Sequence, residues 1–193
     1  MKSRLAILVF LGSAAVSCSE SEKPVNVDFL PLLHVADINF TSPTYLADST
    51  LPLDQDLPSG TNLSYSYRMV ATRLNLRQAG SDITEVESVL LRFRMSIESR
   101  GFDGTGEVTL YLGTGADVYN DPTALVLNDK KILPATFEFS SSDRRLPFIL
   151  DQDEFYFGYQ VLLEPLRLSS RSNSATGLIE TLAAEIKGLR GIR

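Results

Sequence analysis

The sequence predicts an all-β protein, an antiparallel β-sandwich for which a jelly roll is one candidate topology. Three observations predict it. Short segments alternate apolar and polar residues with the period of two that a half-buried strand requires. Clusters of glycine, proline, asparagine and aspartate divide these segments at close spacing, as they do in sandwiches and barrels. No apolar stripe of helical length precedes residue 177.

The first part of the chain predicts one short strand and one long loop. Residues Val35–Phe40 are mostly apolar and follow Pro31, so we expect a strand there, preceded by an extended segment. Residues Thr41–Asn62 are rich in proline, aspartate, serine, threonine and glycine. A loop of this length without structure of its own is often functional, so Thr41–Asn62 is a candidate binding rim.

The middle of the chain has the clearest strand patterns. Within Leu63–Leu76 the apolar residues change parity, which predicts a strand with a bulge near Thr72. Within Val89–Glu98 apolar residues recur at every second position, and the positions between them are polar except for Leu90, so one face is expected in the core and the other in solvent. The glycines of Gly101–Gly106 permit a turn and the alternation then resumes, so residues 88–112 are expected to form an antiparallel hairpin.

The second half of the chain predicts shorter strands and one ambiguous segment. A strand from Phe155 is expected to continue to Leu168 past Pro165. Gly177–Arg193 fits a helical stripe or a strand beside residues 155–168, and we expect the strand. The shorter strands are expected at Ala124–Leu127, Lys131–Leu133, Thr136–Phe139 and Leu146–Leu150.

The N-terminal residues have the pattern of a targeting signal. Lys2 and Arg4 precede the apolar run Leu5–Leu11, and small residues then lead to Cys18. This resembles the lipobox of bacterial lipoproteins. The resemblance implies that residues 1–17 are a signal peptide and that Cys18 becomes a lipidated first residue, carrying diacylglyceryl and usually an N-acyl chain.

The same resemblance sets the expected domain organisation. We expect a tether over residues 18–34 and a β-sandwich domain over 35–193. A plain secretory signal would need no cysteine at this point, and the apolar run is too short for a membrane-spanning helix. Two or more acyl chains would anchor the protein stably. The residue after the cysteine is Ser19 and not aspartate, and in this the sequence resembles Gram-negative lipoproteins that are sent to the outer membrane. The run Ser19–Glu22 also resembles export signals of surface lipoproteins in Bacteroidota, although a solvated linker is the preferred interpretation.

Charge excludes some partners. Lys2 and Arg4 are the only charged residues before Cys18, so the remaining chain holds 16 basic and 24 acidic residues, a formal charge of −8. Nucleic acids and anionic lipid head groups select basic surfaces, so neither is an expected partner, and the membrane is reached through the lipid anchor.

Catalysis by an activated nucleophile is not expected. His34 is the only histidine and lies among apolar residues, where a partly buried structural role is the expectation. Cys18 is the only cysteine, so the monomer has no disulfide, and a zinc site of His and Cys ligands is not expected either. We expect no metal and no other cofactor.

Acidic clusters supply the candidate ligand-binding residues. Calcium or a pair of catalytic carboxylates for glycan hydrolysis would use such groups, whereas solvated turns are their commoner role. The clusters lie in the long loop, in the glycine-bearing segment Gly113–Pro122 and before the strand at residue 155. Their members are Asp54, Asp56, Asp117, Tyr119, Asn120, Asp121, Asp151 and Asp153.

A second resemblance supports the fold. Ile83–Phe93 with Gly106–Tyr111 looks like the central hairpin of jelly-roll modules in secreted and surface bacterial proteins, some of which bind carbohydrate. The sequence therefore predicts a non-enzymatic, lipid-anchored binding or assembly module of the outer membrane, with a protein or glycan partner. An apolar-cargo carrier and a carboxylate-based glycan hydrolase are the alternatives.

Overall fold

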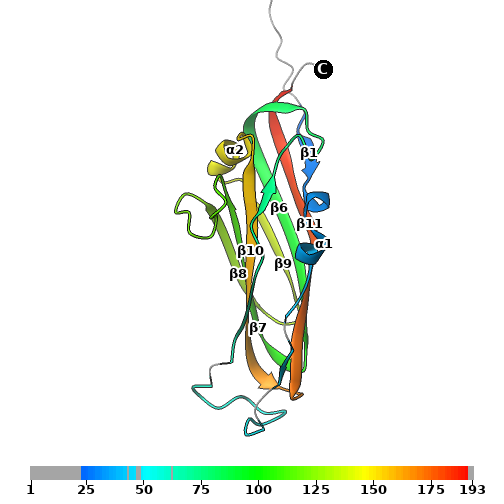
Figure 1. Ribbon diagram of the computed structural model, residues 1–193, viewed down its shortest axis with the longest axis vertical. Helices are drawn as coiled ribbons and strands as arrows, with labels where there is room; N and C mark the ends of the chain where they lie inside the picture. Colours follow the sequence, from blue (N-terminus) through cyan, green and yellow to red (C-terminus); the bar gives the residue numbers. More distant parts are fainter. Residues whose placement is uncertain (1–22, 43, 47–48, 62, 191–193) are drawn as a thin grey trace, which may run out of the picture.

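The computed structural model describes residues 23–42, 44–46, 49–61 and 63–190, which form two antiparallel sheets packed against each other (Figure 1). The predicted all-β sandwich is thereby confirmed. The six-stranded sheet has the order β1-β11-β6-β9, with β2 and β3 also paired to β11. The five-stranded sheet has the order β4-β10-β7-β8, with β5 also paired to β10.

Four long strands dominate the two sheets, and short strands extend their edges. The strands are β1 (Val25–Asp28), β2 (Asn39–Thr41), β3 (Tyr45–Leu46), β4 (Tyr65–Arg68), β5 (Thr72–Leu74), β6 (Ile83–Arg100), β7 (Phe102–Gly113), β8 (Leu125–Ile132), β9 (Ala135–Ser141), β10 (Phe155–Leu168) and β11 (Ser172–Arg190). The helices are a 3-10 turn at Leu30–Leu32, α1 (Val35–Ile38) and α2 (Arg145–Leu150).

The core lies between the sheets and is built from the inward parity of the long strands. Phe93 and Met95 of β6 are almost fully buried, while Arg92 and Arg94, which alternate with them, are exposed. The Phe93 ring meets the Phe157 ring of β10 across the interior at 5.9 Å between centroids. The predicted wet and buried faces of residues 89–98 and 155–161 are therefore confirmed.

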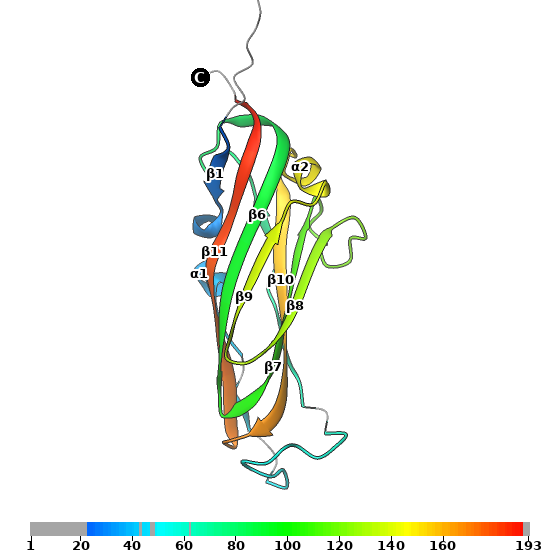
Figure 2. The ribbon, with the colours of Figure 1, turned by 180° about the vertical axis from the view of Figure 1, so that it is seen from behind.

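The molecule is elongated and has two different ends (Figures 1 and 2). At the end that we call the terminal end, β1 begins with Val25 opposite Ile186, close to where β11 finishes. At the opposite end, the loop end, β6 turns into β7 at Gly101 and β10 turns into β11. The 14 residues of β11 between Ile186 and Ser172 span about 45 Å at the usual strand rise of ~3.3 Å per residue.

The predicted hairpin over residues 88–112 is wrong in its pairing. The strands β6 and β7 do follow each other through a tight turn at Gly101, whose φ is +79°. They pair with different partners, however, because β6 lies between β11 and β9 and β7 lies between β10 and β8. The turn therefore carries the chain from one sheet to the other. Likewise β11 is the expected strand, but it lies beside β6 and not beside residues 155–168.

The predicted bulge near Thr72 is confirmed in a stronger form. Both β4 and β5 pair with β10, with Arg68 opposite Gln160 and Thr72 opposite Phe157. The four residue steps from Arg68 to Thr72 thus lie opposite three residue steps along β10, so the edge formed by β4 and β5 contains one extra residue.

Two short apolar segments form helices where strands were expected. Residues Val35–Ile38 are α1, and only the following residues Asn39–Thr41 continue as a strand. The segment Leu146–Leu150 lies in α2, which buries Leu146, Ile149 and Leu150 at helical spacing. An apolar run this short fits either period, so packing at the end of the sandwich decides it.

The folded domain also begins earlier than residue 35. Val25–Asp28 pairs with β11, and Val27, Phe29 and Leu33 are buried in the core. Prolines flank this segment on both sides, and four residues are too few to give a clear alternation. His34, expected to be partly buried, is exposed, and its carbonyl oxygen accepts the amides of Asp37 and Ile38 at the start of α1. Between residues 124 and 141 the sequence predicted three short strands, whereas the structure has two longer ones, β8 and β9.

Candidate functional site

The long loop forms the surface of the loop end, and it is held in place there. The amide of Asp54 donates to the carbonyl of Leu168 at 2.7 Å, and the amide of Leu57 donates to Leu166 at 2.8 Å. The Arg171 guanidinium donates to the Leu51 carbonyl at 2.6 Å. Partly buried leucines of the loop, Leu51, Leu53 and Leu57, pack against the core. These contacts close the sandwich and give the loop backbone one arrangement.

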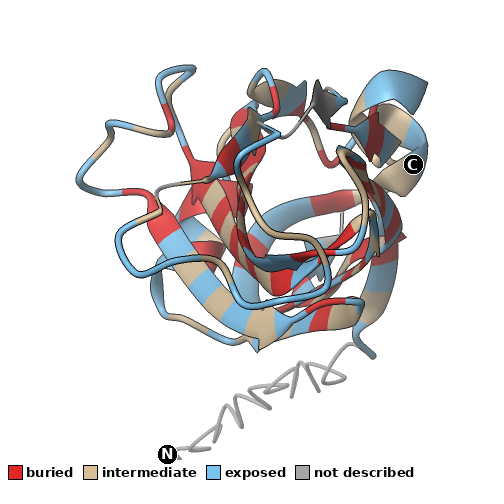
Figure 3. Ribbon diagram, turned by 90° about the horizontal axis from the view of Figure 1, so that it is seen from below, coloured by how far each residue is buried: buried red, intermediate tan, exposed pale blue. Residues whose placement is uncertain are grey.

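The outward side of this loop is polar. Asp54, Gln55 and Asp56 are exposed, as are Pro58, Ser59 and Gly60. Figure 3 views the loop end along the long axis and shows mostly exposed and intermediate residues in the loops, with the buried residues on the strands behind them. We call residues 49–61 and 166–171 the loop-end surface. It combines a fixed backbone with accessible hydrogen-bonding groups.

Acidic residues of the loop-end surface gather around one arginine. The Arg167 guanidinium donates to the Asp56 carboxylate at 2.8 and 3.2 Å. This hydrogen bond, with the nearby charges of Asp56, Asp103 and Asp54, raises the pKa of Arg167. Within the loop-end surface the carboxylates of Asp54 and Asp56 are matched in number by the guanidiniums of Arg167 and Arg171, so its formal charge is zero. Leu166, beside the arginine, is 57% exposed and adds an apolar contact area.

Asp54 has an unusual backbone conformation. Its φ is +57°, in the left-handed region that residues other than glycine seldom adopt, although aspartate is among the more tolerant. The turn that presents Gln55 and Asp56 thus requires a residue that tolerates a positive φ at position 54.

The second predicted cluster, in residues 113–122, lies elsewhere and is structural. The Asn120 amide donates to the Asp117 carboxylate at 2.9 Å, within the loop itself. The Asp121 carboxylate accepts from the amide and hydroxyl of Thr123, which lowers its pKa. These are the solvated-turn roles that aspartate commonly takes.

Tyr119 fixes this loop onto the outer face of the five-stranded sheet. Its hydroxyl donates to the Met69 carbonyl at 2.5 Å and lies 3.3 Å from that of Tyr159. The Arg68 guanidinium lies 4.8 Å from the ring centroid, and the Tyr111 ring packs edge-on at 4.9 Å. Burial raises the pKa of Tyr119 to about 12. The side chain is therefore engaged by the protein.

The third cluster lies near the terminal end and caps neighbouring backbone. The Asp151 carboxylate accepts the Val86 amide at 3.0 Å, and the Asp153 carbonyl accepts from the Asn75 side chain. The three predicted clusters thus lie at three separate places. Within the described ranges no group of three or more His, Cys, Asp or Glu residues is placed to hold a metal ion. Cys18 lies outside the described residues.

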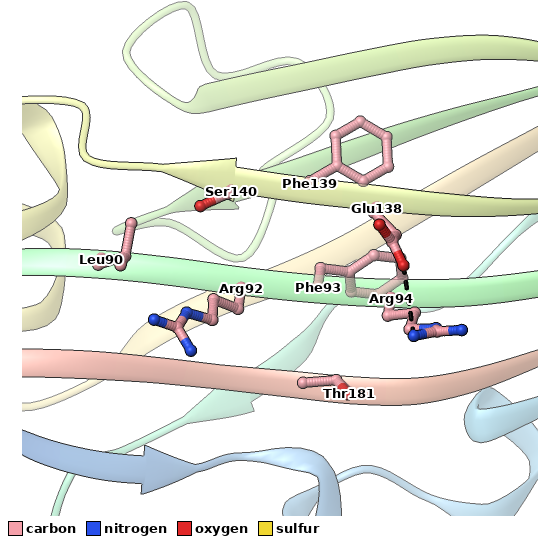
Figure 4. Close-up of a pocket in the computed structure, with 8 residues that line it drawn as sticks. All are labelled: Leu90, Arg92, Phe93, Arg94, Glu138, Phe139, Ser140 and Thr181. Carbon is pink, nitrogen blue, oxygen red and sulfur yellow. Dashed lines mark ion pairs between the residues drawn. The ribbon is translucent and has the colours of Figure 1, made fainter.

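A shallow groove of about 590 Å³ lies along the six-stranded sheet, where sequence patterns pointed to no site. Figure 4 shows Glu138 of β9 reaching toward Arg94 of β6, which it pairs with at 3.3 Å. Arg94 also pairs with Glu180 at 2.8 Å, and Arg92 pairs with Glu185 at 3.3 Å. Both arginines are already balanced by carboxylates, so this groove has no excess positive charge to attract an anion.

Comparisons with known proteins add no family. No family model matches the sequence, and no curated protein matches it. A chain in the cryo-EM structure of Mud Crab Dicistrovirus is similar at a TM-score of 0.24 and 12% identity, over 100% of this chain and 84% of that chain. A similarity of that size carries no argument about fold or function.

The described part of the chain contains no helix that is long and apolar enough to cross a membrane. Among the candidate residues, Asp117 and Asn120 are exposed and hydrogen-bonded to each other, Asp151 and Asp153 are exposed near the terminal end, and Asp54 and Asp56 lie together on the loop-end surface. Their partners Arg167 and Leu166 were missed, because both follow a proline at the end of a strand pattern and carry no motif of their own.

Proposed function

We propose that this protein is a lipid-anchored binding or assembly module of the bacterial outer membrane that engages a protein or glycan through its loop-end surface. The observation that carries the proposal is the separation of the two ends. Val25, seven residues after Cys18, pairs near the end of β11, whereas the loop-end surface lies where β11 begins. An anchor at Cys18 would therefore present the loop-end surface about 45 Å further out, given the rise of β11.

The state of the loop-end surface also supports binding. Because hydrogen bonds to Leu166, Leu168 and Arg171 hold the loop backbone, a partner would not have to order it on association. Its exposed carboxylates, amide and leucine supply the mixture of polar and apolar contacts that recognition surfaces use.

The packed interior is the reason to prefer binding over carriage of an apolar molecule. Phe93, Phe157 and Tyr159 form a continuous set of ring contacts between the sheets, at 5.9 and 6.4 Å between centroids. A cargo would have to displace these rings. The carboxylates Asp151 and Asp117 are engaged with backbone and amide donors near the other end, so they favour the capping role over hydrolysis.

The anchor is tested by metabolic labelling with an alkyne fatty acid. The full-length protein is expected to take up the label, and Cys18→Ala is expected to lose it together with its membrane fraction. Protease treatment of intact and lysed cells then tells which side of the outer membrane the domain faces. An unlabelled wild-type protein would contradict the anchor.

The binding surface is tested with the soluble chain from residue 19 onward. Binding to purified peptidoglycan, to surface polysaccharide and to intact cells of the source organism is measured by co-sedimentation. The loop-end variant Gln55→Ala with Asp56→Ser is expected to lose most of the binding. A matched control, Glu87→Ala with Ser88→Ala, alters two exposed residues of β6 near the other end. Equal binding by both variants would exclude the loop-end surface.

A further inference from the structure

The terminal end carries an apolar surface on α2. This helix closes the end of the sandwich by burying Leu146, Ile149 and Leu150. Phe148 lies on the opposite side of the same helix and is 67% exposed. Beside it is a groove of about 270 Å³, mostly apolar, that Ile149, Pro122 and Gly113 also line. We call Phe148 and this groove the α2 surface.

Two arginines and one carboxylate lie next to the α2 surface: Arg144, the exposed N-cap residue of α2, Arg145 and Asp143. The Arg145 guanidinium pairs with the Asp143 carboxylate at 3.0 and 3.1 Å, and it also donates to the Ala124 carbonyl at 2.9 Å. The arginine holds the pKa of Asp143 well down, at about 2. The lining of the groove is mostly apolar, so an occupant of the α2 surface would be recognised mainly by apolar contact, with one more cation than anion beside it.

The α2 surface lies at the end of the molecule where the described chain begins. The Val86 amide donates to Asp151, the residue that directly follows α2. Val86 pairs with Gly188 of β11, two residues from Ile186, which pairs with Val25. Figures 1 and 2 both show α2, β1 and the C-terminal end of β11 at this same end.

The length of chain before Val25 limits how far a bilayer lies from this end. Seven residue steps lead from Cys18 to Val25, so a fully extended chain spans at most about 24 Å at ~3.4 Å per step. A tether this short holds the α2 surface at an effective concentration on the order of millimolar relative to the membrane. A weak apolar contact is then sufficient, and an exposed aromatic ring is suited to the boundary between head groups and acyl chains.

We propose that the α2 surface contacts the lipid bilayer, with Phe148 inserted at the boundary between head groups and acyl chains. This inference rests on the proposed lipid anchor. It makes the terminal end a second point of attachment, which restricts the tilt of the domain and so the direction in which the loop-end surface points.

The test uses the absence of tryptophan from the chain. The soluble chain from residue 19 onward carries an N-terminal polyhistidine segment that tethers it to zwitterionic vesicles containing a nickel-chelating lipid. Phe148→Trp then provides the only tryptophan. On tethering we expect a blue shift of its emission and a loss of quenching by acrylamide. Ile132→Trp is the matched control, since Ile132 is 76% exposed and pairs with Thr105 near the loop end. Its spectrum is expected to stay unchanged.

An unchanged Phe148→Trp spectrum, with co-sedimentation showing the protein on the vesicles, would overturn the proposal, and so would equal shifts at both positions. Hydrogen exchange of the wild-type chain gives a second measurement that needs no substitution. The amides of Leu146, Phe148, Ile149 and Leu150 are expected to gain protection on vesicles; Pro147 between them has none. Because the artificial tether replaces Cys18, a failure here is distinct from a failure of lipidation in cells, and the acyl chains of Cys18 itself cannot produce the signal.

Discussion

Gly158→Ala is expected to destabilise the fold through one side chain, Tyr119. Gly158 is buried in β10 beneath the Tyr119 ring, and a Cβ there would overlap the Tyr119 hydroxyl and lie 2.7 Å from its Cζ. The ring would have to move away. It would then lose its hydrogen bond to Met69, its contact with Arg68 and its edge contact with Tyr111.

The size of the effect follows from those three contacts. A net hydrogen bond contributes about 1 kcal/mol, an exposed cation–π contact about 0.5–1, and an aromatic pair about 0.5–1.5. Gly158→Ala should therefore lower the free energy of unfolding by about 2–3.5 kcal/mol, which lowers the Tm by roughly 4–14 °C for a domain of this size.

A double-mutant cycle in urea tests this reasoning. In the Tyr119→Ala background the ring is absent, so adding Gly158→Ala should cost less than about 0.5 kcal/mol, and the coupling energy should account for most of the single-mutant effect. Additive losses in the double variant would show that Gly158 is required for a reason other than Tyr119.

Three further predictions concern charge and backbone. Burial raises the pKa of Asp37 in the folded protein, and the charge of His34 partly offsets this rise. The folded state therefore favours the protonated carboxyl. The stability that this preference provides is fully present below the pKa of the unfolded chain and is lost as the pH rises through the pKa of the folded protein. Asp37→Asn should thus unfold at higher urea than the wild type at pH 7 and at similar urea at pH 3; a less stable variant at pH 7 would contradict this. The pKa of Tyr119, raised to about 12, predicts that stability falls as pH rises from 10 toward 12, and a Tyr119→Phe variant should lose less over that range in the same assay. Because the φ of Asp54 is +57°, Asp54→Val should lower the free energy of unfolding by about 1–2 kcal/mol, whereas Asp54→Gly should leave it unchanged. Equal urea midpoints for the two variants would refute the backbone argument.

The faces of the long strands could be predicted from the sequence, but their neighbours could not. Alternation in residues 89–98 tells which side chains are buried, and burial in a sandwich is the same whether the next strand lies in the same sheet or the opposite one. The turn at Gly101 permits both connections, so the hairpin prediction for residues 88–112 chose the commoner and was wrong.

The candidate site was predictable only in part. The long loop was expected as a binding rim from its composition, and the structure adds that it closes one end and is held by Leu168 and Arg171. The distribution of carboxylates was less informative, because Asp121 and Asp151 cap local amides in a way that sequence spacing does not distinguish from ligand binding. The helix α2 was missed since five apolar residues fit either period.

The position of β11 affects the order in which the chain can fold. Of the described strands, β11 is the last to be synthesised, yet it lies in the middle of its sheet and supplies the neighbour of β1, β2, β3 and β6. Until β11 emerges, the 18 residues of β6 have only β9 to pair with, and the backbone groups along their other edge have no strand partner. Contacts this distant in sequence form slowly. The six-stranded sheet can therefore be completed only after the whole of β11 is available, and deletion of this strand should leave β1, β2 and β3 without their partner and prevent the sandwich from forming.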